Sequence, residues 1–255
     1  MKVIEVKGLS FSYVKFFEPL IKNISFSVEQ GTFLSIIGPN GSGKTTLFRL
    51  LTGIIRPKRN TVFVWGRDIN SYQRKELVKY ISALPSSEII HNEVLRVDDY
   101  LELARYPYIS GFGGLRDVDY SIIETAKKIT HTHRLGKKYL WELSQGELAR
   151  VRIARMIAQD SKILIMDEPT AHLDIDHKLW FFGALRRMKA NGKTVIAIIH
   201  DINFAYKFSD ELLVLNDGRI EFHGRKENVD FKLLERVFNV KIKRVNDDLI
   251  FEETF

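Results

Sequence analysis

The sequence predicts an α/β fold, and two repeating patterns support this prediction. Short apolar runs are typical of strands that are buried on both faces of a parallel sheet. The chain has four of them, "TFLSIIG" at 32–38, "KILIMDE" at 162–168, "KTVIAIIHD" at 193–201 and "ELLVLNDG" at 211–218. The segments between them place apolar residues three or four positions apart, which is the spacing of one buried helix face. An example is the series Leu179, Phe182, Leu185 and Met188.

Two stretches near the N-terminus alternate apolar and polar residues with a period of two. They are Leu9, Phe11 and Tyr13, followed by Ile24, Phe26 and Val28. Such alternation is typical of antiparallel strands that bury one face and expose the other. We therefore expect an N-terminal antiparallel β subdomain beside the α/β lobe.

The strand pattern disappears between about residues 86 and 160. The segments there have helical spacing, and they are "VDDYLELARY", "YSIIETAKKI" and "GELARVRIARMIAQD". A chain of 255 residues can bury a sizeable core as one large domain. We expect a single domain, 1–255, in which residues 1–85 and 161–255 form the α/β lobe and residues 86–160 form an inserted α-helical subdomain.

The composition of the chain limits the partners, the metal sites and the cellular location that we expect. Lysine and arginine outnumber the acids 39 to 32, but the basic residues are scattered, so we interpret them as a solvated surface and expect no nucleic-acid partner. The chain has no cysteine, which excludes disulfides and thiolate metal sites. No apolar run approaches the ~18 residues that a membrane-spanning helix needs. We expect a soluble intracellular protein.

The strongest motif is "GPNGSGKTT", which follows a buried strand and precedes the helix-like "LFRLLTG". It matches G-x-x-x-x-G-K-[ST], in which backbone N–H groups and a helix N-terminus cradle phosphates. Lys44 would reach the outer phosphates, and the Thr45 hydroxyl would hold magnesium. By itself the loop leaves kinases, GTPases and motor ATPases open. The nucleotide-binding residues expected here are Gly38, Pro39, Asn40, Gly41, Ser42, Gly43, Lys44, Thr45 and Thr46.

A second group of polar residues follows two buried strands. Asp167 ends the strand in "ILIMDEPT", where a carboxylate can be an outer magnesium ligand. Adjacent Glu168 can polarise a water for attack on the γ-phosphate, although two acids at a strand end are also common turn residues. His200 ends the run "TVIAIIH". It is either a buried or strand-capping histidine or a γ-phosphate contact coupled to Glu168.

The segment "LSQGE", Leu143 to Glu147, has the spacing of a helix start. Ser144 and Glu147 form the S-x-x-E pattern of a capping box, in which each side chain bonds a backbone N–H of the other residue. Capping does not explain Gly146, because glycine in a first helical turn costs stability. We interpret this glycine as a position that something approaches closely.

Together these motifs resemble the ATP-binding cassette (ABC) ATPases over nearly the whole chain. The resemblance implies a RecA-like P-loop NTPase lobe that binds ATP and Mg²⁺, with "GPNGSGKT" as the Walker A loop, "ILIMDE" as Walker B and "AHLD" (171–174) as the D-loop. It also implies that Tyr13 stacks on adenine, that Glu168 and His200 are catalytic, and that Asp174 contacts nucleotide.

The same resemblance identifies "LSQGE" as the signature motif. In that family the signature faces the Walker A loop of a second copy, so Ser144, Gln145 and Gly146 would address the partner's phosphate. ATP would then drive a head-to-tail dimer. The chain departs from the family pattern at Ser86, where a glutamine is usual. A serine oxygen can ligate magnesium, so we expect Ser86 near the metal with Thr45 and Asp167.

Two functions remain open from the sequence. The first is the ATPase subunit of a membrane importer, peripheral on the inner face of the cell membrane, which works with separate permease subunits and indirectly with a solute-binding protein. The segments "VDDYLELARYPY" and "EPTAHLDIDH" resemble the iron-chelate, haem and cobalamin uptake group. The alternative is a soluble single-cassette ATPase without a permease, such as an iron–sulfur assembly ATPase.

Overall fold

A six-stranded sheet forms the centre of the protein. The computed structural model describes residues 1–255 apart from 15–16, 87–93, 110–112, 171–172, 246–247 and 254–255. The strand order is β10-β9-β3-β8-β7-β6, in which β9 to β6 run parallel and β10 is antiparallel to β9. The strands are β3 Phe33–Ile37, β6 Ile81–Leu84, β7 Ile163–Asp167, β8 Thr194–Ile198, β9 Glu211–Asn216 and β10 Arg219–Arg225.

All four apolar runs of the sequence are parallel strands of this sheet, so the α/β prediction is confirmed. Strands β3, β7 and β8 are buried along their whole length. Successive side chains of a strand point to opposite faces. Leu34 and Ile36 accordingly pack in one hydrophobic cluster, whereas Phe33 and Ile37 pack in another on the opposite face.

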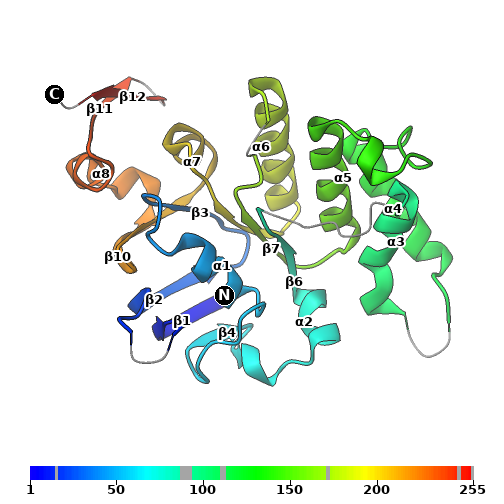
Figure 1. The fold of residues 1–255 in the computed structure, drawn as a ribbon, viewed down its shortest axis with the longest axis horizontal. Coiled ribbons are helices and arrows are strands. Elements are labelled where there is room, and N and C mark those ends of the chain that lie inside the picture. The colour runs from blue at the N-terminus through cyan, green and yellow to red at the C-terminus, as the bar shows by residue number, and fades with distance from the viewer. Residues whose placement is uncertain (15–16, 87–93, 110–112, 171–172, 246–247, 254–255) are drawn as a thin grey trace.

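The first face of the central sheet is covered by helix α1 and by a second sheet (Figure 1). This second sheet is antiparallel, has the order β2-β1-β4-β5 and confirms the predicted N-terminal subdomain. Strand β1 ends at Phe11, so Tyr13 lies two residues beyond it. The elements are β1 Lys2–Phe11, β2 Ile21–Glu29, α1 Lys44–Leu51, β4 Val62–Val64 and β5 Arg67–Asp68.

The opposite face is covered by helices that follow the strands. Phe181 and Phe182 of α6 are fully buried against it, together with residues of α5, α7 and α8. A C-terminal hairpin contacts α7 and α8, and the sequence analysis did not anticipate it. The elements are α5 Gln145–Ala158, α6 Ile175–Ala190, α7 Ile202–Phe208, α8 Phe231–Phe238, β11 Val240–Val245 and β12 Asp248–Glu253.

Helices also dominate the described part of residues 86–160, and they lie together at one end of the molecule (Figure 1). They share a hydrophobic cluster of their own, which includes Tyr100, Ile123 and Val151. This cluster supports the expected helical subdomain, although its boundaries at 86 and 160 stay a prediction. The remaining elements are α2 Arg74–Tyr80, α3 Val97–Glu102 and α4 Asp117–Thr130, with short 3₁₀ helices η1 Ile69–Ser71, η2 Leu103–Tyr108, η3 Leu140–Glu142 and η4 Lys226–Asn228.

Across the described residues, none of the helices is both long enough and apolar enough to span a bilayer.

The turn between β9 and β10 fixes the loop that follows β3. The Gly218 N–H donates to the Ser42 carbonyl at 3.1 Å, and the Gly218 carbonyl accepts from the Lys22 N–H at 2.8 Å. Gly218 has a φ of +73°, and a Cβ there would lie 2.1 Å from the Leu20 carbonyl oxygen. No residue other than glycine fits this position without moving the backbone.

We expect Gly218→Ala to destabilise the protein by roughly 2–4 kcal/mol, because it adds a backbone collision to the strain of a left-handed conformation. Gly192→Ala is the matched control, since Gly192 has a φ of +82° and open space around its Cβ position. The free energy of unfolding of that variant should fall by only about 1 kcal/mol, which is the cost of placing alanine in a left-handed conformation. Urea unfolding measures both losses, and equal losses would contradict the packing argument.

Candidate functional site

The phosphate-type loop, which comprises residues 38–43 of the motif "GPNGSGKTT", lies between β3 and α1, as the sequence predicts. Two of its glycines, Gly38 and Gly43, are required because a side chain there would collide with neighbouring residues. A Cβ on Gly38 would lie 2.0 Å from the Leu215 carbonyl oxygen, and one on Gly43 would lie 2.8 Å from Ile21 Cδ1. Gly43 is also the N-cap of α1, with a φ of +102°. The loop is therefore packed closely against β2 and β9.

Lys44 is buried against this loop. Its Nζ donates to the carbonyl oxygens of Gly38 and Pro39, both at 2.8 Å. Burial lowers the pKa of Lys44, while the nearby carboxylates of Glu168 and Asp167 act in the opposite direction. A partly desolvated ammonium group held beside helix α1 is well placed to interact with an anion.

Asp167 is the buried carboxylate at the end of β7, with 1% of the residue exposed. Ser86 Oγ donates to its Oδ2 at 3.2 Å, and its Oδ1 has no hydrogen-bond partner among the described residues. Burial raises the pKa of Asp167, although hydrogen bonding from the Thr45 and Ser86 hydroxyls opposes this shift. The Thr45 and Ser86 hydroxyls both lie next to the Asp167 carboxylate, and oxygen ligands suit Mg²⁺. The donor set and the unsatisfied Oδ1 therefore fit a magnesium ion.

Glu168 and His200 meet at the carboxyl edge of the sheet. His200 Nε2 lies 2.5 Å from Glu168 Oε1, and 48% of the His200 side chain is exposed. The alternative of a buried core histidine is therefore wrong. Glu168 has a φ of +50°, which is uncommon for a residue with a side chain and is often found at functional sites. Its N–H donates to the Ile198 carbonyl at 3.2 Å, which ties the turn to β8.

The phosphate-type loop and Glu168 line a common pocket of about 260 Å³. A smaller pocket of about 60 Å³ lies next to Glu168 and brings in Ser86 and Gln145. The residues of the first pocket are Leu20, Asn40, Gly41, Gly43, Lys44, Thr45, Thr46 and Glu168.

A larger pocket of about 510 Å³ lies elsewhere, next to Arg186 and Asp210. None of the predicted site residues lines it, and Lys189 and Asp210 on its wall form an ion pair at 2.7 Å. The pocket formed by the phosphate-type loop is thus the better candidate, although it is smaller.

Tyr13 lies beside the start of α1. Its hydroxyl is 3.3 Å from Thr46 Oγ1 and accepts from Arg49 Nη1 at 3.1 Å. Phe11 contacts the ring edge to face, and Tyr13 is 54% exposed. An exposed ring next to the loop suits stacking on a base and does not suit a core role. The sequence analysis missed Arg49, because the pattern in "LFRLLTG" gives no signal for a contact 36 residues away.

Ser144 begins helix α5 and forms the predicted capping box. Its Oγ accepts from the Glu147 N–H at 3.2 Å, and Glu147 Oε2 accepts from the Ser144 N–H at 2.9 Å. Hydrogen bonding from the Ser144 backbone holds the pKa of Glu147 below its ordinary value. Neither Ser144 nor Gly146 lines the pocket at the phosphate-type loop of the same chain.

A histidine that the sequence analysis missed contacts this helix start. Asp174 caps helix α6 by accepting from the His177 N–H at 3.0 Å, and the same oxygen lies 2.5 Å from His177 Nδ1. A Cβ on Gly146 would lie 3.3 Å from His177 Nε2. The chain's own His177 therefore provides one close approach to Gly146. Two other residues of the predicted D-loop, Ala171 and His172, lie outside the described residues.

Comparisons with known proteins agree with this geometry. Residues 21–171 match the ABC transporter family. A petrobactin import ATP-binding protein of Bacillus subtilis is 33% identical over 242 residues, which cover 94% of both chains. A solved inward-facing metal-chelate type ABC transporter, described as putative, has a TM-score of 0.80 and 25% identity, and the match covers 100% of this chain and 98% of that chain.

A bacterial ABC transporter cassette solved as a dimer has a TM-score of 0.76 and 26% identity, and the match covers 89% of this chain and 100% of that chain. The family match extends over more than half of the sequence and includes the phosphate-type loop, the signature segment and the Asp167–Glu168 strand end. The chain therefore belongs to the ATP-binding cassette family of transporter ATPases, which bind and hydrolyse ATP to power transport.

Proposed function

We propose that this ATPase powers the import of an iron chelate, or of the related haem or cobalamin type of solute, through separate permease subunits. The petrobactin import relative and the metal-chelate type structure support this solute class. They favour the importer over a soluble ATPase of the iron–sulfur assembly type. As an importer subunit, the chain sits on the inner face of the cell membrane. It contacts the permease and reaches the solute-binding protein only indirectly.

The observation that carries the catalytic assignment is the pairing of Glu168 with His200 next to Lys44 and Asp167. Lys44 and the loop N–H groups bind the β- and γ-phosphates of ATP. Thr45, Asp167 and Ser86 hold Mg²⁺, which when bound neutralises charge on the phosphate oxygens. Tyr13 stacks on the adenine base.

Glu168 is the residue that accepts a proton from the attacking water. His200, bonded to its Oε1, fixes the direction of the carboxylate and leaves the other oxygen available for the water. A carboxylate held in position needs no reorganisation when the reaction occurs. The positive φ of Glu168 aims the side chain away from the line of β7 and toward the pocket.

The signature segment completes the site of a second copy. Ser144, Gln145 and Gly146 begin α5, and a helix N-terminus favours a nearby phosphate. The dimeric cassette among the similar structures supports a head-to-tail pair in which each signature faces the partner's ATP. Asp174 bonds His177, and His177 lies next to Gly146. The D-loop residue Asp174 would therefore lie near the same interface.

Glu168→Gln should retain ATP binding and lose about 10²–10⁴-fold in hydrolysis, because it removes the general base and preserves the shape of the side chain. Lys44→Ala is the contrasting variant, since it removes charge from the phosphate site and should weaken ATP binding itself. Phosphate release and equilibrium binding of a fluorescent ATP analogue measure the two effects. Wild-type turnover of Glu168→Gln would contradict the assignment.

Ser86→Ala should weaken activation by Mg²⁺ about 10- to 100-fold, because the hydroxyl bonds Asp167 and reaches the expected metal position. Ser86→Gln restores the residue usual in the family and should preserve activation. The measurement is ATPase rate as a function of free Mg²⁺ concentration. If Ser86→Ala titrates like wild type, another group completes the metal shell.

Mixing two inactive variants tests the shared site. Lys44→Ala disables the loop side, and Ser144→Arg blocks the signature side. A mixed dimer contains one site with wild-type Lys44 and wild-type Ser144, so ATP-driven dimerisation should partly recover on mixing. Light scattering with and without ATP measures it, and each variant alone is the control. Normal association and hydrolysis by Ser144→Arg alone would show that "LSQGE" is only a capped helix start.

A further inference from the structure

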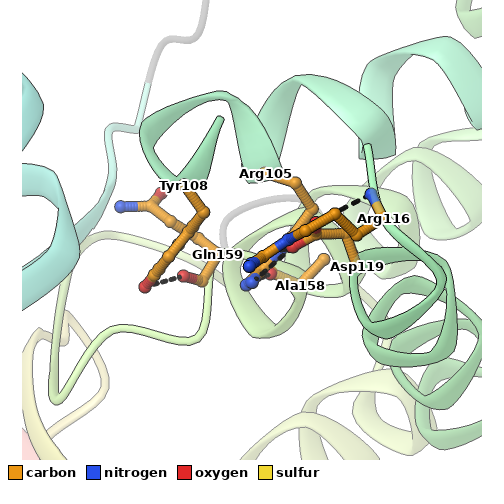
Figure 2. Close-up of polar contacts among 6 residues, drawn as sticks. All are labelled: Arg105, Tyr108, Arg116, Asp119, Ala158 and Gln159. Atoms are coloured by element: carbon orange, nitrogen blue, oxygen red, sulfur yellow. Dashed lines mark hydrogen bonds and ion pairs between the residues drawn. The ribbon is translucent and has the colours of Figure 1, made fainter. Parts of the chain in front are cut away.

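A cluster of polar contacts holds the carboxyl end of α5, the helix that begins at the signature segment (Figure 2). Arg105 Nη1 donates to the Ala158 carbonyl at 2.9 Å, and the Tyr108 hydroxyl donates to the Gln159 carbonyl at 2.9 Å. The last carbonyls of a helix have no partner within the helix. Two side chains of η2 therefore complete the end of α5, and the charge of Arg105 complements the helix dipole.

Arg105 is itself fixed from two sides. Its Nε and Nη2 donate to Asp119 Oδ1 of α4 at 3.0 and 2.9 Å, and its guanidinium carbon lies 3.9 Å from the centroid of the Tyr108 ring. The other Asp119 oxygen accepts from the backbone N–H and Nε of Arg116, at 3.0 and 3.2 Å. Figure 2 shows these side chains converging between η2, α4 and the end of α5.

The Arg105–Asp119 pair is almost entirely buried, with side-chain exposures of 4% and 2%. Burial raises the pKa of Asp119, but the hydrogen bonds from Arg116 and Arg105 outweigh it and hold the pKa below its ordinary value. A buried ion pair is weak evidence for stability, because its desolvation cost offsets much of its attraction. What the pair provides here is one fixed direction for the Arg105 side chain.

Gln159 connects this cluster to the α/β lobe. Its Nε2 donates to the carbonyls of Val78 and Ile81, at 2.6 and 3.1 Å, and its Oε1 accepts from Ser82 Oγ at 3.1 Å. Ile81 and Ser82 belong to β6, which pairs directly with the catalytic strand β7. The residue that caps the carboxyl end of the signature helix is thus bonded to the edge of the central sheet.

We propose that Arg105, Tyr108 and Gln159 are positioning residues for ATP hydrolysis, which set the angle of α5 and so the place of Ser144 and Gly146 relative to β7. The inference rests on the proposed role of the signature at a partner's ATP. Helix α5 has 14 residues and is about 21 Å long, so a tilt of about 3° at this end moves Ser144 by about 1 Å. A displacement of that size in a catalytic site can cost about 10²-fold in rate.

The test uses three single variants of the full chain, which are Arg105→Lys, Gln159→Met and Tyr108→Phe. Lysine cannot reach Asp119 and Ala158 with the same fork of donors, and methionine removes the bonds to Val78 and Ile81. Tyr108→Phe keeps the ring against Arg105 and removes only the hydroxyl, so it remains informative if the other two fail to fold. The matched control is Tyr106→Phe on the same η2 segment, where Tyr106 is 64% exposed.

We expect kcat to fall about 10- to 100-fold in Arg105→Lys and Gln159→Met. In Tyr108→Phe, which loses one hydrogen bond, kcat should fall about 2- to 10-fold. Affinity for a fluorescent ATP analogue and the KM for ATP should stay at wild-type values, because the phosphate-type loop is untouched. ATP-driven dimerisation, measured in the Glu168→Gln background, should weaken with kcat. Tyr106→Phe should match wild type in every assay.

Folded variants with wild-type kcat and dimerisation would overturn the inference. A parallel loss of ATP affinity and kcat would also overturn it, because that pattern indicates general loosening of the cassette. A wild-type chain that neither hydrolyses ATP nor dimerises in its presence would contradict the proposed function itself. Failure of the inference and failure of the proposed function are therefore distinguishable.

Discussion

Parallel pairing of β3, β8 and β7 is the constraint on which the site depends. In register, Leu34 of β3 faces Ile196 of β8, and Leu164 of β7 faces Val195, so the three strands end at the same edge. The loop that holds Lys44 leaves β3 at this edge, Glu168 follows β7 and His200 follows β8. Because the strand order fixes these neighbours, residues more than 30 positions apart meet within hydrogen-bond distance.

This arrangement concentrates charge where water is largely excluded. Lys44 and Asp167 are both almost fully buried, and burial alone disfavours the charged form of each. Their opposite charges compensate in part, as do the loop carbonyls bonded to Lys44 and the hydroxyls bonded to Asp167. A site with an ammonium group, carboxylates and an unsatisfied carboxylate oxygen is arranged to receive phosphates together with a cation.

Helix α5 is held by different means at its two ends. The Ser144–Glu147 capping box at its start involves residues three positions apart, so it forms as soon as the helix does. At its other end, Arg105 and Gln159 connect it to η2, α4 and β6, which are separate elements of the chain. The first contact defines the helix, whereas the second defines its position in the protein. The proposed action of the signature segment on another subunit requires both.

The sequence by itself determined the features that arise from local interactions. Apolar runs predicted the parallel strands and alternation predicted the antiparallel strands, because each pattern depends on neighbours within a few residues. The glycine motif predicted the position of the loop, although the collisions that require Gly38 and Gly43 involve distant residues. Only the tertiary structure decided which distant groups meet. Strand order and helix packing set these long-range contacts, and local periodicity carries no information about them. They are the contacts of Ser86 with Asp167, Tyr13 with Arg49, His177 with Gly146 and Gln159 with β6.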